Sequence, residues 1–404
     1  MDPARPPRVS RRSFIRRSAA VGAAALALPS CVGPGIVNND DVVKVCAIGC
    51  GGRGSRDLRA LSAVPNVKIV GVCELLDDRL QVAQEIARAH APNGYRDYRR
   101  MLEREKPDGV SIVVEVQNHA KVVVPVLEMG FNCFSEKPVD NSVERVDKLV
   151  AAARRTKKWV QFGFQRRYIP AHRAIVEEIH QKKLGRVYAL QGHWHFFRPQ
   201  GTEDADWDGG RLIEQACHHM DAMSWVMNGQ LPLRCVSIGR PPMEVGEHSF
   251  TNISEAGSAT AFEFPGNVIF SYTHFMGVPG TIGEDESVST KPAEQNTINE
   301  KLWVFCEQGA YDLTQGMRYL RDAEKTKERI GKASKGYDNG TEEEFAAFID
   351  CLRSGRTPYS NHETARVSTL MALMARKAMY NRESRDFTPR VIEWKDLGST
   401  SDTA

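Results

Sequence analysis

Between residues 42 and 160, short runs of apolar and β-branched residues alternate with segments in which apolar residues recur every three or four positions. The first pattern is typical of buried parallel strands and the second of amphipathic helices. The strand-like runs are Val42–Ile48, Asn66–Cys73, Gly109–Val116, Phe131–Phe134 and Trp159–Phe164. The helical segments are Arg53–Val64, Leu76–His90, Tyr98–Glu105, His119–Met129 and Asn141–Lys157. This alternation predicts an α/β domain with a doubly wound parallel sheet over residues 41–160.

After residue 160 the pattern predicts a second domain of a different class. A helix is expected at Ala171–Leu184, and strands are expected at Val187–Phe197, Ala259–Phe264, Val268–Phe275, Leu302–Phe305 and Tyr311–Leu313. Pro265-Gly266-Asn267 is a hairpin signal between two of these strands. The pattern favours an α+β domain with a large open, mostly antiparallel sheet over residues 161–397, followed by a disordered tail at 398–404.

Three further segments complete the second domain. Residues 277–300 are polar and lack periodicity, which predicts a long loop. Thr341 and Glu344 match a capping box ahead of a helix that ends before Gly355. A final helix is expected at about His362–Tyr380.

Residues 1–31 have the features of an export signal. The stretch Ser10–Arg16, S-R-R-S-F-I-R, precedes an uncharged run that is too short to span a bilayer. The arginine pair resembles a twin-arginine signal, which predicts a periplasmic protein. Cleavage at the A-x-A site Ala25–Ala27 competes with a lipobox reading that would anchor a lipid at Cys31. The alternative is a disordered basic tail. Residues 32–40 would be a linker.

Composition narrows the class of protein. The chain is 41% hydrophobic and 26% charged, as in ordinary soluble globular proteins. Its net charge of +3 depends on six arginines within the first 17 residues, so no basic patch indicates a nucleic-acid partner. The nine cysteines are odd in number and contain no C-x-x-C pair, so we expect neither a disulfide framework nor a metal site.

Glycines follow the first predicted strand in the spacing G-x-G-x-x-G, at Gly49, Gly51 and Gly54. Such glycines allow a tight turn, close approach of pyrophosphate and packing of the next helix. Glu74 ends the second predicted strand, where a carboxylate can accept hydrogen bonds from both hydroxyls of a ribose. The pattern predicts a dinucleotide-binding Rossmann domain. Glu74 would repel a 2′-phosphate, so NAD is expected over NADP, although Arg53 or Arg79 could pair with that phosphate.

Three later motifs make the prediction more specific. They are E-K-P at 136–138, Q-R-R-Y at 165–168 and E-Q-A-C-H-H-M-D at 214–221. In this order, and with the glycines, they resemble the Gfo/Idh/MocA family (glucose–fructose oxidoreductase, inositol dehydrogenase and rhizopine catabolism) over residues 42–397. The resemblance implies NAD or NADP, a sugar or cyclitol substrate, and a cis bond between Lys137 and Pro138.

The chain departs from the family pattern at two places. Family members commonly carry T-P-x-x-x-H before E-K-P; His119 matches the histidine, but Val114 and Glu115 replace Thr-Pro. Many members have Asp four residues before the active-site histidine, whereas this chain has Glu214. The first departure alters the usual cofactor-facing loop, and the second weakens inference of the substrate by analogy.

The catalytic residues expected from these motifs are Lys137, His218 and Glu214. If residues 214–221 are helical, Glu214 and His218 share one face, and the carboxylate would raise the basicity of the imidazole as a general base. A structural or metal-binding histidine pair is the alternative reading. Lys137, restrained by the following proline, could stabilise an alkoxide or relay its proton.

The remaining predicted contacts fall into two sets. The cofactor set is Gly49, Cys50, Gly51, Gly52, Arg53, Gly54, Glu74, Arg79, His119, Glu136, Lys137 and Gln165. The substrate set is Arg166, Arg167, Tyr168, Trp194 and His219.

These predictions favour an exported oxidoreductase that moves a hydride between a sugar or cyclitol hydroxyl and the nicotinamide. A glycosidase that uses NAD transiently and a non-catalytic sugar sensor are the alternatives. An open antiparallel sheet leaves one face uncovered, so a homodimer or homotetramer is also expected.

Overall fold

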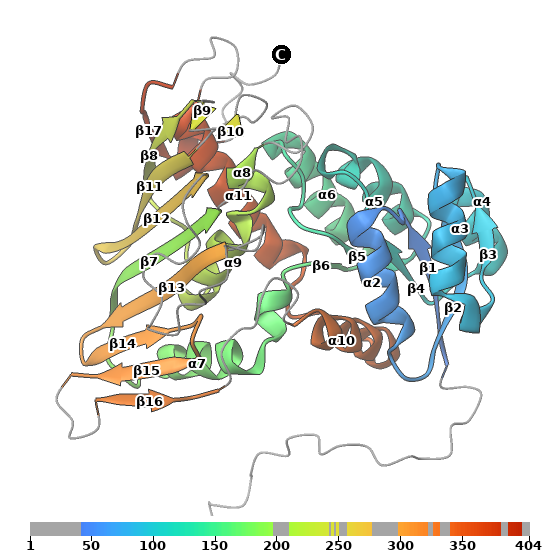
Figure 1. The fold of residues 1–404 in the computed structure, drawn as a ribbon, viewed down its shortest axis with the longest axis horizontal. Coiled ribbons are helices and arrows are strands. Elements are labelled where there is room, and N and C mark those ends of the chain that lie inside the picture. The colour runs from blue at the N-terminus through green and yellow to red at the C-terminus, as the bar shows by residue number, and fades with distance from the viewer. Residues whose placement is uncertain are drawn as a thin grey trace, which may run out of the picture. The chain divides into compact units, whose positions relative to one another are not determined.

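The computed structural model describes residues 42–196, 210–241, 244–245, 248–249, 257–276, 298–321, 326–331, 340–380 and 387–397 (Figure 1). The predicted export signal with Cys31, the linker at 32–40, most of the predicted loop at 277–300 and the tail at 398–404 lie outside these residues. Within the described ranges, no helix has both the length and the hydrophobicity to span a bilayer.

The first domain contains a six-stranded parallel sheet in the order β3-β2-β1-β4-β5-β6, which confirms the predicted doubly wound architecture. Its strands are β1 (Val43–Ile48), β2 (Val67–Cys73), β3 (Asn93–Tyr95), β4 (Gly109–Ile112), β5 (Asn132–Ser135) and β6 (Val160–Phe162). Its helices are α2 (Gly52–Ser62), α3 (Asp77–Ile86), α4 (Tyr98–Glu105), α5 (His119–Glu128) and α6 (Val143–Thr156). The strand order reverses between β1 and β4, the position at which such sheets bind ligands.

Two strands of the first domain differ from the prediction. β3 was not expected, because Asn93-Gly94 is typical of a turn. β4 ends at Ile112 rather than Val116, and Val113 leaves the sheet so that its carbonyl oxygen lies against Gly49. The chain therefore bends away at the point where the glycines begin their turn.

The second domain contains a nine-stranded sheet in the order β16-β15-β14-β13-β7-β12-β11-β8-β17. Among these strands β7 and β12 run parallel and the other pairs are antiparallel, as predicted for a mostly antiparallel sheet. The strands are β7 (Val187–Phe196), β8 (Arg234–Arg240), β11 (Gly257–Phe264), β12 (Val268–Met276), β13 (Ile298–Cys306), β14 (Gly309–Asp312), β15 (Met317–Leu320), β16 (Lys327–Arg329) and β17 (Val391–Glu393). A separate ribbon pairs β9 (Glu244–Val245) with β10 (His248–Ser249). β13 begins inside the predicted loop 277–300, so residues 298–300 are a correction to that prediction.

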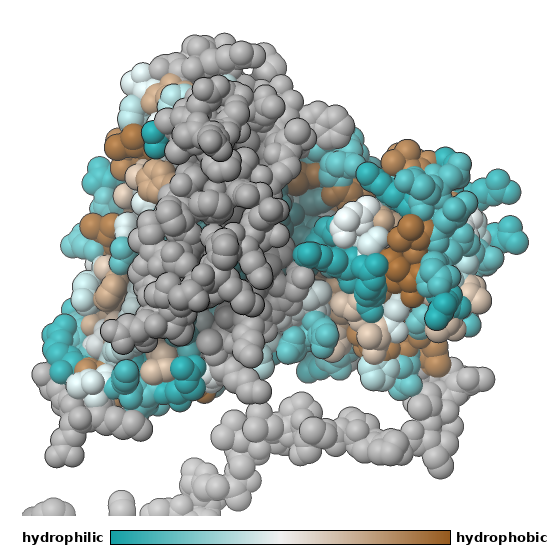
Figure 2. Space-filling view, in the orientation of Figure 1, coloured by the Kyte–Doolittle hydropathy of each residue, from teal (hydrophilic) through white to brown (hydrophobic). Residues whose placement is uncertain are grey.

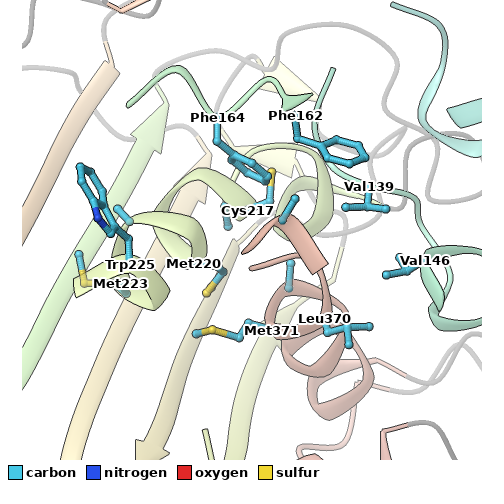
Figure 3. Close-up of a cluster of buried hydrophobic side chains, with 14 of the residues drawn as sticks. Val139, Val146, Phe162, Phe164, Cys217, Met220, Met223, Trp225, Leu370 and Met371 are labelled. Carbon is cyan, nitrogen blue, oxygen red and sulfur yellow. The ribbon is translucent and has the colours of Figure 1, made fainter. Parts of the chain in front are cut away.

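Helices cover one face of this sheet. They are α7 (Pro170–His180), α8 (Arg211–Glu214), α9 (Cys217–Val226) and α11 (His362–Met379). Figure 3 shows Cys217 and Met220 of α9 converging with Leu370 and Met371 of α11, beside Phe164. These side chains are buried in a single hydrophobic cluster, so α9 is held rigidly against the sheet.

Helix α10 (Thr341–Ser354) packs with the first domain although it lies within the sequence of the second, which the predicted boundary at residue 160 did not anticipate. Phe345 and Phe348 lie in the cluster that contains β1, and the Phe345 ring centroid is 4.7 Å from that of Phe134. The predicted capping box is wrong: Gly340 is the N-cap, and the Glu344 side chain is completely buried. A helix that must fill the core with Phe345 turns the preceding residue inward as well.

The opposite face of the nine-stranded sheet carries exposed apolar side chains. Ile238, Ile269 and Val391 are 60%, 54% and 61% exposed. Brown hydrophobic residues are interspersed with hydrophilic ones at the left margin of Figure 2, where this sheet lies.

Candidate functional site

The glycine loop between β1 and α2 contains two kinds of glycine. A Cβ at Gly49 would lie 2.0 Å from the Val113 carbonyl oxygen, and one at Gly54 would lie 2.2 Å from the Gly49 carbonyl oxygen. The fold itself excludes side chains there. A Cβ at Gly52 would meet no described atom within 4 Å, and one at Gly51 would meet Arg79 alone, at 3.3 Å. These two glycines leave open backbone at the N-terminus of α2, which fits a pyrophosphate.

Glu74 lies beside the glycine loop, at the end of β2. Its Oε2 accepts a hydrogen bond of 2.8 Å from the Cys50 N–H, and its Oε1 accepts one of 2.7 Å from the Leu75 N–H. The carboxylate is thus oriented where the ribose of a dinucleotide would lie. Burial raises the pKa of the Cys50 thiol to about 12, so Cys50 serves this site through its backbone.

Arg53, at the start of α2, is engaged by two buried carboxylates. Its Nε lies 3.0 Å from Asp57 Oδ1 and 2.8 Å from Glu136 Oε1. This bridge ties the glycine loop to the end of β5. Arg53 and Arg79 were the two residues that could pair with the 2′-phosphate of NADP. Arg53 is instead paired with the protein's own carboxylates, whereas Arg79 lies beside the glycine loop.

The E-K-P segment follows β5, and the bond between Lys137 and Pro138 is cis, as the family resemblance implied. His119 was predicted to contact the cofactor, but both of its ring nitrogens face backbone carbonyls. Nδ1 lies 2.7 Å from the Pro138 oxygen, and Nε2 lies 3.0 Å from the Val114 oxygen. The ring is buried between these two segments, so His119 supports the E-K-P loop rather than offering a nitrogen to a ligand.

Lys137 reaches from the first domain to the second. Its ammonium donates hydrogen bonds of 2.7 Å to the Glu214 carbonyl oxygen and 3.0 Å to Glu214 Oε1. Burial favours the protonated acid, but Lys137 and Arg211 outweigh that effect and hold the pKa of Glu214 below its usual value. The ion pair between Lys137 and Glu214 therefore joins the two domains. It follows directly on Glu136, the residue that pairs with Arg53 at the glycine loop.

The predicted helical face shared by Glu214 and His218 is wrong. Helix α8 ends at Glu214 and α9 begins at Cys217. In a continuous helix the His218 N–H would donate to the Glu214 carbonyl. Here that carbonyl accepts from Lys137, and the His218 N–H donates to the Gln215 oxygen at 3.1 Å. The Glu214 carboxylate accordingly turns to Lys137.

His218 lies at the start of α9 with its ring buried. The ring meets Phe164 edge-on at 5.9 Å and Trp194 at 5.9 Å between centroids. Burial, and then the charges of Lys137 and Arg166, place the pKa of His218 well below its ordinary value. The imidazole is therefore neutral at physiological pH.

A second polar group lies next to this ring. The Arg166 guanidinium stacks over Trp194 at 5.0 Å and forms an ion pair with Glu300 of β13. His219 Nε2 lies 3.5 Å from Glu300 Oε1. The structure thus brings together Arg166, Trp194 and His219, three of the residues predicted to contact the substrate. Glu300 was missed, because it was assigned to a loop.

The other predicted substrate contacts, Arg167 and Tyr168, point into the protein. Arg167 makes two hydrogen bonds to Asp221, of 2.7 and 2.9 Å, and both side chains are buried. The buried Tyr168 hydroxyl accepts a hydrogen bond from the Ser360 N–H. These residues hold α9 and α11 in place, which corrects their assignment. Gln165 is buried as well, and its backbone carbonyl oxygen lies against Gly340.

Comparison with known proteins identifies the family. A family model described as "Oxidoreductase family, NAD-binding Rossmann fold" matches residues 43–164, and one described as "Oxidoreductase family, C-terminal alpha/beta domain" matches residues 176–385. The chain belongs to the Gfo/Idh/MocA oxidoreductase family. The open glycines and Glu74 fit the NAD that its first domain binds.

Individual curated relatives have low sequence identity to this chain. The chain is 27% identical to rhizopine catabolism protein MocA of Rhizobium meliloti over 46% of this chain and 57% of that protein. It is 27% identical to inositol 2-dehydrogenase of Salmonella typhimurium over 46% and 55%. It is 28% identical to glycosyl hydrolase family 109 protein 1 of Akkermansia muciniphila over 29% and 26%. These matches thus span about a quarter to three-fifths of the relatives' lengths.

Solved structures show the same fold. The scyllo-inositol dehydrogenase of Lactobacillus casei, solved with NAD(H) and scyllo-inositol, matches with a TM-score of 0.66 at 14% identity. The match covers 88% of this chain and 99% of that one. An oxidoreductase domain protein of Kribbella flavida matches with a TM-score of 0.70 at 16% identity over 87% and 99%.

Glu344 of α10 is a buried acid next to the Arg53 bridge. Neither of its carboxyl oxygens has a hydrogen-bond partner among the described residues. Burial, and then the charges of Glu136, Asp57 and Asp221, raise the pKa of Glu344 well above its ordinary value, against the opposing effect of Arg53. The surroundings of Glu344 therefore favour the protonated form of its carboxyl group.

We predict that Glu344→Gln stabilises the protein increasingly as pH rises. A carboxyl group with a raised folded-state pKa binds its proton more tightly in the folded state. Stability therefore falls as pH rises above the ordinary carboxyl pKa of about 4.3, until the folded-state pKa is reached. The slope approaches about 1.4 kcal/mol per pH unit. The melting temperature of the variant should exceed that of the wild type by more at pH 8 than at pH 5.

The matched control is Glu343→Gln, one residue earlier in the same helix and exposed. Its difference from the wild type should not change with pH. A Glu344→Gln difference that is equal at pH 5 and pH 8 would contradict a buried protonated acid.

Proposed function

We propose that the protein is an NAD-dependent dehydrogenase that acts on a hydroxyl of a sugar, sugar derivative or cyclitol. The observation that carries this proposal is the Lys137–Glu214 pair, which sets an ammonium next to the buried neutral His218 at the edge of the NAD-binding domain. Relatives named as inositol dehydrogenases support a cyclitol-like substrate.

The roles of the side chains follow from their charges. NAD, when bound, supplies the acceptor for a hydride. The reacting hydroxyl must lose its proton as its carbon loses the hydride, and neutral His218 can accept that proton. The Lys137 ammonium, oriented by Glu214, stabilises the negative charge that develops on the oxygen. Glu214 is thus a positioning residue for Lys137.

A panel of neutral hexoses, cyclitols, hexuronates and p-nitrophenyl glycosides tests the class of reaction. We expect NADH formation with at least one polyol. Because one relative is named as a glycosyl hydrolase family 109 protein, the alternative outcome is release of p-nitrophenol without net formation of NADH. That outcome would replace the dehydrogenase proposal by the glycosidase.

With the substrate found, His218→Ala should lower kcat by about 10²–10⁴-fold, because a positioned base contributes that much. Lys137→Ala should be at least as damaging, and Glu214→Gln should cost less. NAD affinity of His218→Ala, measured by calorimetry, should be nearly unchanged. Retention of more than about half of wild-type kcat by His218→Ala would assign the proton transfer to Lys137 alone.

We also propose that two or four copies associate through the exposed face of the nine-stranded sheet. The support is the apolar surface of Ile238, Ile269 and Val391. Light scattering should give a dimer or tetramer mass for the wild type, and Ile238→Lys should shift it towards the monomer. A wild-type monomer at micromolar concentration would refute this.

Export by the twin-arginine route is the last element of the proposal, supported by Arg11-Arg12 and the uncharged run that follows. The double substitution of Arg11 and Arg12 by Lys keeps the charge, but it should hold the protein in the cytoplasm. Normal periplasmic recovery of this variant would exclude the route. Palmitate labelling lost in Cys31→Ala would establish the lipid anchor.

A further inference from the structure

We infer that Glu300 selects the substrate: its carboxylate accepts hydrogen bonds from adjacent hydroxyls of a neutral polyol and rejects sugar acids. The inference rests on the proposed dehydrogenase function and narrows its substrate class. Glu300 lies on β13, in the part of the sheet that faces α9, and next to the predicted substrate residues Arg166 and His219.

Arg166 is the cation that would otherwise attract an acid. Its guanidinium is held between the Trp194 ring, at 5.0 Å, and the Glu300 carboxylate. Only 12% of the Arg166 side chain is exposed. An arginine that is already paired and stacked has little remaining charge to offer to a carboxylate on the substrate.

His219 lies against Glu300 from a second side. Both the Arg166 and the His219 contacts end on Oε1. His219 packs on Tyr272 at 5.0 Å, and a Cβ at Gly192 would lie 3.1 Å from its ring, so the imidazole fills its place fully. Burial lowers the pKa of His219 well below its ordinary value, and the nearby Arg166 lowers it further, so His219 adds no positive charge.

The Glu300 carboxylate is the partly exposed acid of this group and can meet a ligand. The Glu300 side chain is 22% exposed, more than its partner Arg166. An ionised carboxylate only accepts hydrogen bonds, and adjacent hydroxyls are donors that match it. A carboxylate on the substrate at the same place would face like charge and could form no hydrogen bond with it.

The test compares a neutral polyol substrate with its hexuronate counterpart in the full-length protein. Glu300→Gln keeps the shape but removes the charge and releases Arg166. We expect the KM for the neutral substrate to rise roughly tenfold or more, as for a lost hydrogen bond to a charged group, with a smaller change in kcat. The ratio of kcat/KM for the acid over the neutral substrate should rise at least about tenfold. Glu300→Asp keeps the charge and should keep rejecting the acid.

Glu307→Gln is the matched control, since Glu307 forms an Arg–Glu pair with Arg186 just after the same strand, away from the site. NAD affinity and melting temperature of each variant show whether it is folded. A wild type that prefers the hexuronate, or a Glu300→Gln ratio within twofold of the wild type, overturns the inference and leaves the dehydrogenase standing. If no polyol reduces NAD with the wild type, the proposed function fails instead.

Discussion

The ammonium of Lys137 must be satisfied where it is almost fully removed from water, and the site is organised by that requirement. A buried ammonium without a partner would cost several kcal/mol. Glu214 answers with both its carboxylate and its carbonyl. The carbonyl thereby accepts no hydrogen bond from the His218 N–H, so the segment divides into α8 and α9 and His218 lies in the first turn of α9. One ion pair thus joins the domains and sets the position of the imidazole.

The same rule of paired charges extends beneath the site. Arg53 meets Asp57 and Glu136, and all three are held together at the base of the glycine loop. Glu344 lies near the same three side chains. Its burial and the charges of Glu136 and Asp57 raise its pKa, which favours its neutral form. Removing one partner of a buried pair costs about 3–5 kcal/mol, so these contacts make the alignment of the domain edge insensitive to small disturbances.

The sequence carries the parallel sheet and the NAD site well because they depend on local patterns: apolar strands, glycine spacing and the acid at a strand end. It fails where long-range contacts decide. The spacing of Glu214 and His218 suggests one helical face only if the helix is continuous, and Lys137, which interrupts it, is 77 residues away. The spacing of Thr341 and Glu344 matched a capping box, but Glu344 is buried next to Phe345, which packs in the hydrophobic core. Glu300 lies in a polar stretch whose strand is formed by pairing with β7.

The glycine fingerprint itself combines two signals. Gly49 and Gly54 are required by backbone contacts that exist without any ligand, so they indicate the fold. A Cβ at Gly52 would meet no described atom within 4 Å, and one at Gly51 would meet only the end of the Arg79 side chain, so these two glycines indicate the ligand. The substrate side divides in the same way. The pair of Lys137 and Glu214 joins two of the motifs that identify the family. Glu300, which pairs with Arg166, lies outside those motifs, and its place beside them follows from the pairing of β13 with β7.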